Sequence, residues 1–354
     1  MKKLLFFGIF VAILLWGCSP SGDQSNEAGL TVQTTLFPLY DFARNIGGER
    51  VQVNLLLPPG VSPHSYEPSP RDMVAIDQAD LLLYLGRSLD PWVERLLSEQ
   101  RQEKALAVST NLSLLDTRSD HSHGDHDHSH GDHDHSHGDH DHSHGDHDHS
   151  HGDHDHSHGD HDHSHGDHDH SHGDHDHSHG KYDPHVWLDP IHAITMVETI
   201  TEAFIQKDPA GREYYENRSK NYISELEELH RMAQEKLASH EGKTILYAGH
   251  FAFGYFSRRY NLAHTSPFRG FSPNAEPSPR AVERIIQRVE EEEARTIFFE
   301  EMLNPALAEM ISEETGTEIA LLHGLHNIRR DEVGERATYL SIMKNNIQKL
   351  ADGL

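Results

Sequence analysis

The stretch TVQTTLFPLYDFARNIGGERVQVNLLL, residues 31–57, decides the fold of this chain. It opens with an apolar run at 31–37 that is typical of a β-strand, and it continues through a helical pattern at 39–46 that stops at a Gly-Gly pair. A second apolar run follows at 51–57. A strand, a helix and a strand in this order indicate a parallel sheet, because parallel strands need a long crossover that a helix supplies.

The same alternation continues on both sides of one long helical segment. Further strands are expected at 79–86, 105–110, 244–249, 295–300 and 317–322. Further helices are expected at 70–79, 91–103, 190–206, 279–292, 304–315 and 334–350. The long segment, 212–239, repeats apolar residues on one helical face, at Tyr215, Tyr222, Leu226, Leu229, Ala233 and Leu237. The sequence therefore predicts an α/β protein with two lobes, each a parallel sheet with flanking helices, on either side of this helix.

These patterns predict a chain of several distinct parts. In order, we expect a signal peptide at 1–17, a tether at 18–28, an N-terminal α/β lobe at 29–206, a linking helix at 207–240 and a C-terminal α/β lobe at 241–354. The first lobe is interrupted by a repeat at 121–180. The signal and the repeat leave 277 residues, which agrees with about 100–200 residues for each of two domains.

The repeat at 121–180 contains only His, Ser, Gly and Asp. The unit HSHGDHD recurs eight times before a closing HSHG, and the repeat holds 26 of the 35 histidines. Without an apolar residue it cannot offset the entropy of ordering, so we expect it to be disordered. Imidazoles and carboxylates at this density bind borderline metals weakly at many places, which predicts metal buffering rather than one defined site.

The amino terminus has the pattern of an export signal. Two lysines precede an apolar run of 13 residues at 4–16, which is short for a membrane span and typical of a signal sequence. Gly17 and Cys18 follow the run, in a segment that resembles a bacterial lipoprotein cleavage box, and Cys18 is the only Cys in the chain. We therefore expect lipidation at Cys18 and an extracytoplasmic protein anchored to the membrane. A plain secretory signal and an uncleaved anchor are the alternatives.

The charge of the chain excludes one class of partner. The formal net charge is −28, of which 16 negative charges are Asp residues of the repeat, so the remainder carries −12. Such a chain repels phosphate backbones and has no basic stripe, which argues against nucleic-acid binding. An acidic, His-rich chain suits cations.

Nine histidines lie outside the repeat, and five of them occur where a ligand site is expected. His64 and His250 follow predicted strands, and His185 precedes a helix. His323 and His326 both follow the last strand. In open α/β sheets, ligands bind beyond the carboxyl ends of the strands. Four imidazoles from four separate loops suit one tetrahedral site, whereas their spacing excludes a zinc finger. The others are interpreted as helix or loop residues: His192, His230, His240 and His264.

Four segments together resemble a known family. They are GVSPHSYEPSPRDMVAIDQADLLLYLG at 60–86, DPHVWLDP at 183–190, GHFAFGYFSRRYNL at 249–262 and FSPNAEPSPR at 271–280. They resemble the metal-binding solute-binding proteins of ABC importers, in the zinc branch, and the resemblance covers about 30–350. It implies two α/β lobes joined by a rigid long helix, with the metal held between them. It also implies delivery to a permease with a cytoplasmic ATPase, and we expect a monomer.

The resemblance also implies a ligand set for Zn²⁺. The first three ligand positions of the family fall on His64, His185 and His250. The manganese branch typically has Glu at the third position, and imidazole suits zinc better than manganese. Alignment by eye places the fourth ligand at His326, with His323 and Glu300 as alternatives.

Two other functions compete with metal transport. A zinc hydrolase or hydratase would use three His and an activated water. The sequence has no HExxH, no GxSxG and no paired catalytic carboxylates, and a fourth His closes the site, so we expect no enzyme. A surface adhesin is the third hypothesis, and nothing in the composition supports it.

Overall fold

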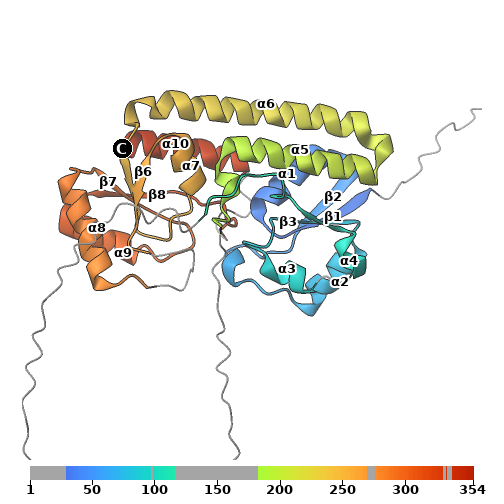
Figure 1. Cartoon of the computed structure of the whole chain (residues 1–354), viewed down its shortest axis with the longest axis horizontal. Helices are drawn as coiled ribbons and strands as arrows, with labels where there is room; N and C mark the ends of the chain where they lie inside the picture. Colours follow the sequence, from blue (N-terminus) through green and yellow to red (C-terminus); the bar gives the residue numbers. More distant parts are fainter. Residues whose placement is uncertain (1–28, 97–98, 117–181, 269–275, 330–331, 333–336) are drawn as a thin grey trace, which may run out of the picture.

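The computed structural model describes residues 29–96, 99–116, 182–268, 276–329, 332 and 337–354 (Figure 1). The predicted signal peptide, the tether with Cys18 and the repeat at 121–180 lie outside these residues. Among the described helices, none combines the length and the apolar character that a membrane crossing requires.

The first lobe is a four-stranded parallel sheet. Its strand order is β2-β1-β3-β4, made by β1 (Leu30–Thr34), β2 (Val51–Leu55), β3 (Leu81–Tyr84) and β4 (Ala105–Ala107). Its helices are α1 (Phe37–Gly47), α2 (Pro70–Gln78), α3 (Pro91–Leu96), α4 (Glu99–Gln102) and α5 (Pro190–Lys207). Successive residues of β3 point to opposite faces. Leu81 and Leu83 pack with α1 and α5, whereas Leu82 packs with α2 and α3, so both faces of the sheet are covered.

The second lobe has four parallel strands of three or four residues each. They are β5 (Thr244–Leu246), β6 (Ala263–Thr265), β7 (Thr296–Phe299) and β8 (Glu318–Leu321). β5 pairs with β6 and β7 with β8, and a single parallel bridge between Tyr247 and Phe298 connects the two pairs. The helices of this lobe are α7 (Gly254–Arg259), α8 (Pro279–Glu291), α9 (Ala306–Thr315) and α10 (Tyr339–Gly353).

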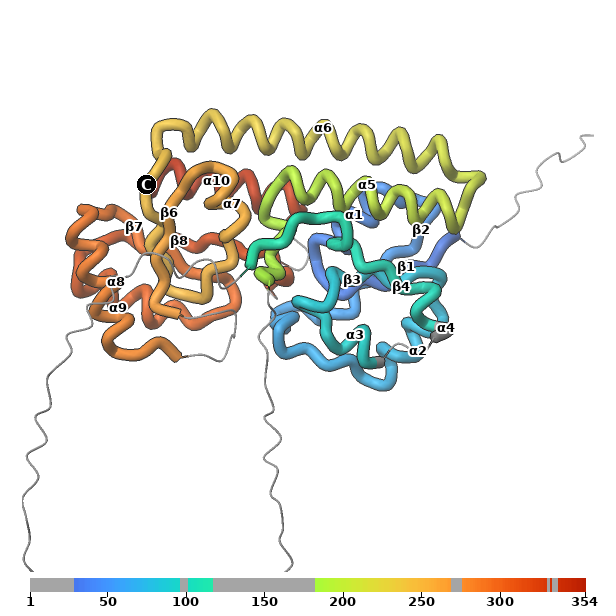
Figure 2. Tube along the Cα trace, viewed as in Figure 1, coloured from blue at the N-terminus to red at the C-terminus, as the bar shows by residue number. Residues whose placement is uncertain are grey.

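One long helix, α6 (Arg212–Leu237), runs along one side of both lobes (Figures 1 and 2). It packs against α1 and α5 at one end and against α10 at the other. Its buried residues are Tyr215, Ser219, Tyr222, Leu226, Leu229, Ala233 and Leu237. This list contains every residue of the apolar stripe, so burial of one face holds α6 against both lobes. The two-lobe α/β architecture expected from the sequence is confirmed.

The structure differs from the sequence expectations in its short elements. The strand expected at 244–249 ends at Leu246, and the helix expected at 91–103 is described as α3 and α4. α7 and β6 have six and three residues and were not predicted, because so few residues show no periodicity. His264, expected in a loop, lies in β6, where its ring stacks on Phe251 with centroids 3.9 Å apart.

Candidate metal centre

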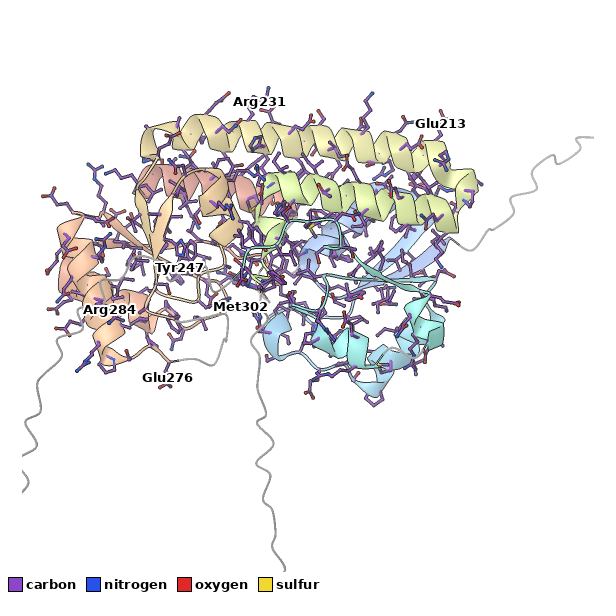
Figure 3. All side chains as sticks on the ribbon, in the orientation of Figure 1. Glu213, Arg231, Tyr247, Glu276, Arg284 and Met302 are labelled. Atoms are coloured by element: carbon purple, nitrogen blue, oxygen red, sulfur yellow. The ribbon has the colours of Figure 1, made fainter. Side chains whose placement is uncertain are left out.

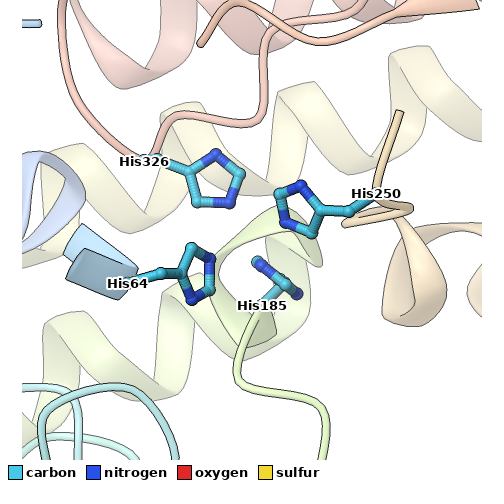
Figure 4. Close-up of side chains that lie close together, drawn as sticks. All are labelled: His64, His185, His250 and His326. Atoms are coloured by element: carbon cyan, nitrogen blue, oxygen red, sulfur yellow. The ribbon is translucent and has the colours of Figure 1, made fainter. Parts of the chain in front are cut away.

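Four histidines from four different loops meet between the lobes (Figure 4). His64 lies in the 3-10 turn η2 (Pro63–Ser65) that follows β2, and His185 comes directly before the turn η4 (Val186–Leu188). His250 follows β5 and His326 follows β8. The structure therefore brings together all four residues that the sequence analysis chose.

The four imidazoles surround one point, and their nitrogens lie slightly farther apart than in a zinc-bound tetrahedral site. One nitrogen from each ring lies within 4.8 Å of each of the other three. The six distances between ring centroids run from 5.0 to 5.5 Å. In a bound site, Zn–N distances of about 2.0–2.1 Å place the nitrogens about 3.3–3.4 Å apart. Each ring has to move inward by less than about 1 Å to reach that geometry.

Burial keeps the imidazoles in the form that binds metal. His185, His250 and His326 are buried, and His64 is half-buried. Burial, together with the charges that neighbouring histidines would carry, lowers the pKa of His64 and of His185 well below the ordinary value. Both rings are therefore neutral at pH 7, and neutral imidazole is the form that coordinates zinc.

Several ring nitrogens at the centre have no protein partner. The Nε2 atoms of His64, His250 and His326 are buried and form no hydrogen bond with the part of the chain that the structure describes. Burying polar atoms without partners costs free energy, so native proteins seldom do it without a reason. A cation bound at the point where these atoms converge satisfies all three.

Two buried carboxylates lie beside the rings of His185 and His250. The Asp183 Oδ1 atom lies 2.7 Å from His185 Nδ1 and also accepts the backbone N–H of His185 at 2.9 Å. The Glu300 Oε2 atom lies 2.6 Å from His250 Nδ1, which is close enough for an ion pair, although the two atoms are not aligned for a hydrogen bond. The hydrogen bond between Asp183 and His185 fixes the ring of His185 and its tautomer, which directs the other nitrogen, Nε2, toward the metal.

Glu301 orients the ring of His326 and also binds the backbone of its loop. Its Oε1 atom lies 3.2 Å from His326 Nδ1, and its carboxylate accepts the backbone N–H groups of Gly324 at 2.7 Å and of His326 at 3.3 Å. Burial opposes its ionisation, but the charge of His323 and these hydrogen bonds hold the pKa of Glu301 well below its usual range. Glu301 therefore adds a full negative charge that compensates a bound dication.

The loop that carries His326 is tightly constrained. A Cβ on Gly324 would lie 2.6 Å from the ring of His326, so only Gly fits at this position. Leu325 adopts a φ of +58°, in the left-handed region that non-glycine residues rarely occupy. Such strain persists where the surrounding structure holds it, and it is typical of functional sites.

The two alternatives for the fourth ligand lie outside the group of four nitrogens. The Nδ1 atom of His323 accepts the backbone N–H of Leu325 at 2.9 Å, and its Nε2 atom lies 3.3 Å from Glu332 Oε2. Glu300 lies behind His250. The geometry therefore favours His326 over both.

Asp183 and Asn327 were not among the residues predicted to form the site. The order Asp-Pro-His at 183–185 carries a signal for the first, because an Asp two residues before a His can reach its ring. Asn327 has no such signal. It is fully buried, and its side-chain amide donates to the carbonyl oxygens of Pro58 and Val61 in the other lobe.

Comparisons with known proteins agree with this site. Over residues 32–353 the chain matches the family described as "Zinc-uptake complex component A periplasmic". The high-affinity zinc uptake system protein ZnuA of Bacillus subtilis is 30% identical over 347 residues, which cover 98% of this chain and 94% of that protein. The zinc-binding lipoprotein AdcA of Streptococcus pneumoniae is 28% identical, and the match covers 99% of this chain and 60% of AdcA.

Solved structures show the same fold. The metal-dependent lipoprotein YcdH from Bacillus subtilis is similar with a TM-score of 0.67 and 27% identity, over 92% of this chain and 99% of that one. The Zn(II)-bound ZnuA-like domain of Streptococcus pneumoniae AdcA is similar with a TM-score of 0.66 and 25% identity, over 92% of this chain and 98% of that one. The family match spans residues 32–353, and this protein therefore belongs to the family of periplasmic zinc-uptake components.

Proposed function

We propose that this protein is the extracytoplasmic zinc-binding subunit of an ABC importer, and that it captures Zn²⁺ between its lobes and delivers it to a membrane permease. One observation carries the proposal, which is the convergence of four histidine nitrogens to within 4.8 Å. Zinc is commonly tetrahedral and readily takes imidazole ligands. The ligands that we propose are His64, His185, His250 and His326.

The parts of the chain have separate tasks in this proposal. The lobes at 29–206 and 241–354, joined by the helix at 207–240, hold the cargo as a monomer. The partner is a permease subunit with its cytoplasmic ATPase, and membership in a zinc-uptake family supports that assignment. The His-rich repeat at 121–180 buffers or collects metal before capture, because its imidazoles bind zinc weakly at many places.

A lipid anchor at Cys18 completes the proposal. Cleavage after residue 17 leaves Cys18 as the new amino terminus, and it is the only Cys in the chain. AdcA of Streptococcus pneumoniae, similar over 99% of this chain, is named a lipoprotein. Anchoring keeps the protein beside its permease and outside the cytoplasmic membrane.

A zinc hydrolase remains the alternative, but the site favours transport. Catalytic zinc sites keep one coordination position open for water, whereas four imidazoles fill a tetrahedral shell. Membership in an uptake family also supports transport over catalysis.

Calorimetry on a chain without residues 121–180 tests the proposal. All four proposed ligands lie outside the deleted segment, and the bridge between Asp116 and Tyr182 holds its ends together. We expect the weak, multiple zinc sites to disappear and one tight equivalent to remain. Loss of the tight site would contradict the assignment. Esterase or CO₂-hydration activity that depends on zinc would favour the hydrolase instead.

A further inference from the structure

Trp187 lies beside two of the proposed zinc ligands and is fully buried. The centroid of its ring lies 5.2 Å from that of His185 and 5.7 Å from that of His326, and the rings meet edge to face. The centroids of the two imidazoles are 5.0 Å apart. Protein interiors are packed as closely as organic crystals, so the indole limits how far either imidazole can turn toward it.

A hydrogen bond joins the same indole to the loop that carries His326. Trp187 Nε1 donates to the carbonyl oxygen of Gly324 at 2.8 Å. Trp187 belongs to η4, which leads into α5 of the first lobe, whereas Gly324 follows β8 in the second lobe. A phenyl ring fills a core as an indole does but has no N–H, so the N–H of Trp187 adds a directional contact between the lobes.

The backbone of this loop is held from two sides. Within the second lobe, the carboxylate of Glu301 accepts the N–H of Gly324 at 2.7 Å. The indole of Trp187 binds the carbonyl oxygen of the same residue. Leu325, the next residue, has a φ of +58°, a conformation that persists where the surrounding structure enforces it. Trp187 therefore helps to fix the backbone two residues before His326.

Buried hydrogen bonds also fix the position of Trp187 itself. The hydroxyl of Tyr339, at the start of α10, donates to the backbone carbonyl oxygen of Trp187 at 2.6 Å. The backbone N–H of Tyr339 donates to Asp41 Oδ2 in α1 at 3.2 Å, and the hydroxyl of Tyr222 in α6 donates to the same oxygen at 3.0 Å. Trp187 is thus held by a connected network that includes both lobes and the long helix.

We propose that Trp187 is a positioning residue for zinc, whose indole holds His326 close to its ligand distance from His185 before the metal arrives and so keeps the site four-coordinate. This inference rests on the proposed function. A ligand that is already in place loses little conformational entropy on binding, which raises the affinity. A ligand that moves freely leaves a coordination position to water, which changes the number of ligands around the metal.

The test follows zinc release from the full chain into an excess of chelator by stopped-flow absorbance. Zinc on the weak sites of the repeat leaves first, and the one equivalent at the metal centre leaves in a slower phase. Trp187→Phe keeps an aromatic ring but removes the N–H that binds Gly324, so it should speed the slow phase about 10–100-fold. Tyr339→Phe keeps the indole and removes the hydroxyl that supports it, so it should act in the same direction by a smaller factor.

Tyr215→Phe is the matched control, because it also removes one hydrogen-bond donor from a fully buried aromatic side chain. The Tyr215 hydroxyl donates to Asp208 Oδ2 at 2.8 Å. Figure 3 labels Glu213, two residues before Tyr215, at one end of α6, and Met302 where the two lobes meet. The control should therefore lower the free energy of unfolding in urea and still release zinc at the parent rate.

Cobalt reports the number of ligands directly. Co²⁺ in a tetrahedral site absorbs visible light much more strongly than Co²⁺ with five or six ligands. At saturating Co²⁺ the repeat contributes equally to the parent and to the variants, so difference spectra show the metal centre. We expect the absorption of the centre to be weaker in Trp187→Phe than in the parent and unchanged in Tyr215→Phe.

These measurements separate the inference from the proposed function. If Trp187→Phe released zinc at the parent rate, or if Tyr215→Phe sped release as much, Trp187 would not be a positioning residue. Faster release with a parent-like cobalt spectrum would contradict the statement that Trp187 keeps the site four-coordinate. Absence of a slow phase of one equivalent in the parent would instead contradict the proposed function.

Discussion

Asn327 joins the two lobes through Pro58, whose carbonyl oxygen accepts a hydrogen bond from the Asn327 side chain at 2.6 Å. The same amide group donates to the carbonyl oxygen of Val61 at 3.0 Å. Asn327 directly follows His326, and Val61 lies three residues before His64. One buried side chain therefore connects the loops of two proposed zinc ligands that come from different lobes.

We expect Asn327→Ala to lower the free energy of unfolding and to speed the dissociation of zinc. The change leaves two carbonyl oxygens without their donor, which costs about 1–3 kcal/mol of unfolding free energy. The loops of His64 and His326 then separate more readily, so zinc should dissociate faster. Urea unfolding and stopped-flow transfer of zinc to a chelator measure the two effects. Asn217→Ala, at an exposed position on α6, is the control, and equal dissociation rates for both variants would refute the role of Asn327.

Replacing His326 should remove a direct ligand. In the chain without the repeat, we expect His326→Ala to lose far more zinc affinity than the ~10–100-fold that is typical for residues behind the ligands. His323→Ala and Glu300→Ala should stay within that smaller range, because both residues lie outside the group of four nitrogens. Competition with a chelator of known affinity measures all three. The assignment fails if His326→Ala binds like the parent while one of the others does not.

Removing the contact between Asp183 and His185 should lower the zinc affinity less than removing a ligand does. Asp183→Asn keeps an oxygen for the backbone N–H of His185 but removes the negative charge from the ring nitrogen. We expect zinc affinity to fall by about 10–100-fold with the stoichiometry unchanged. Asp352→Asn, on an exposed residue of α10, is the matched control. A parent-like affinity for Asp183→Asn would show that this carboxylate does not support the ligand.

Asp90 predicts a pH dependence of stability that is separate from the metal centre. Burial raises the pKa of its carboxyl from 3.8 to about 6, although the backbone N–H of Leu85 and the hydroxyl of Thr35 donate to it. Since the folded pKa is raised, its contribution to stability is present below pH 3.8 and is lost as pH rises through about 6.

Asp90→Asn tests this dependence, because an amide does not titrate. Between about pH 4 and 7, the unfolding free energy of the parent should fall relative to that of Asp90→Asn by on the order of 3 kcal/mol. Urea unfolding of both proteins at several pH values measures the difference in their unfolding free energies. The other titrating groups are common to both proteins, so their contributions cancel in this difference. A difference that does not change with pH would mean that Asp90 titrates normally.

Much of the architecture could be predicted because it depends on local patterns. The stripe from Tyr215 to Leu237 predicted a helix, and burial of that stripe holds α6 against both lobes. β6 was not predicted. It has only three residues, of which Ala263 is exposed, and so short a segment shows no alternation of apolar and polar residues. β6 is stabilised by pairing with β5, and the residues next to β6 in the sequence do not predict this pairing.

By itself, the sequence determined the two-lobe α/β fold, the long helix and a set of histidines in separate loops as candidates for one metal site. Periodicity and strand ends are properties of a few consecutive residues, so they can be recognised in the sequence alone. Only the tertiary structure decided which groups support those histidines. Glu300 and Glu301 are adjacent in sequence, yet one lies beside His250 and the other beside His326. Which ring each carboxylate reaches depends on how two loops from different strands pack together, and that packing exists only once the lobes have formed.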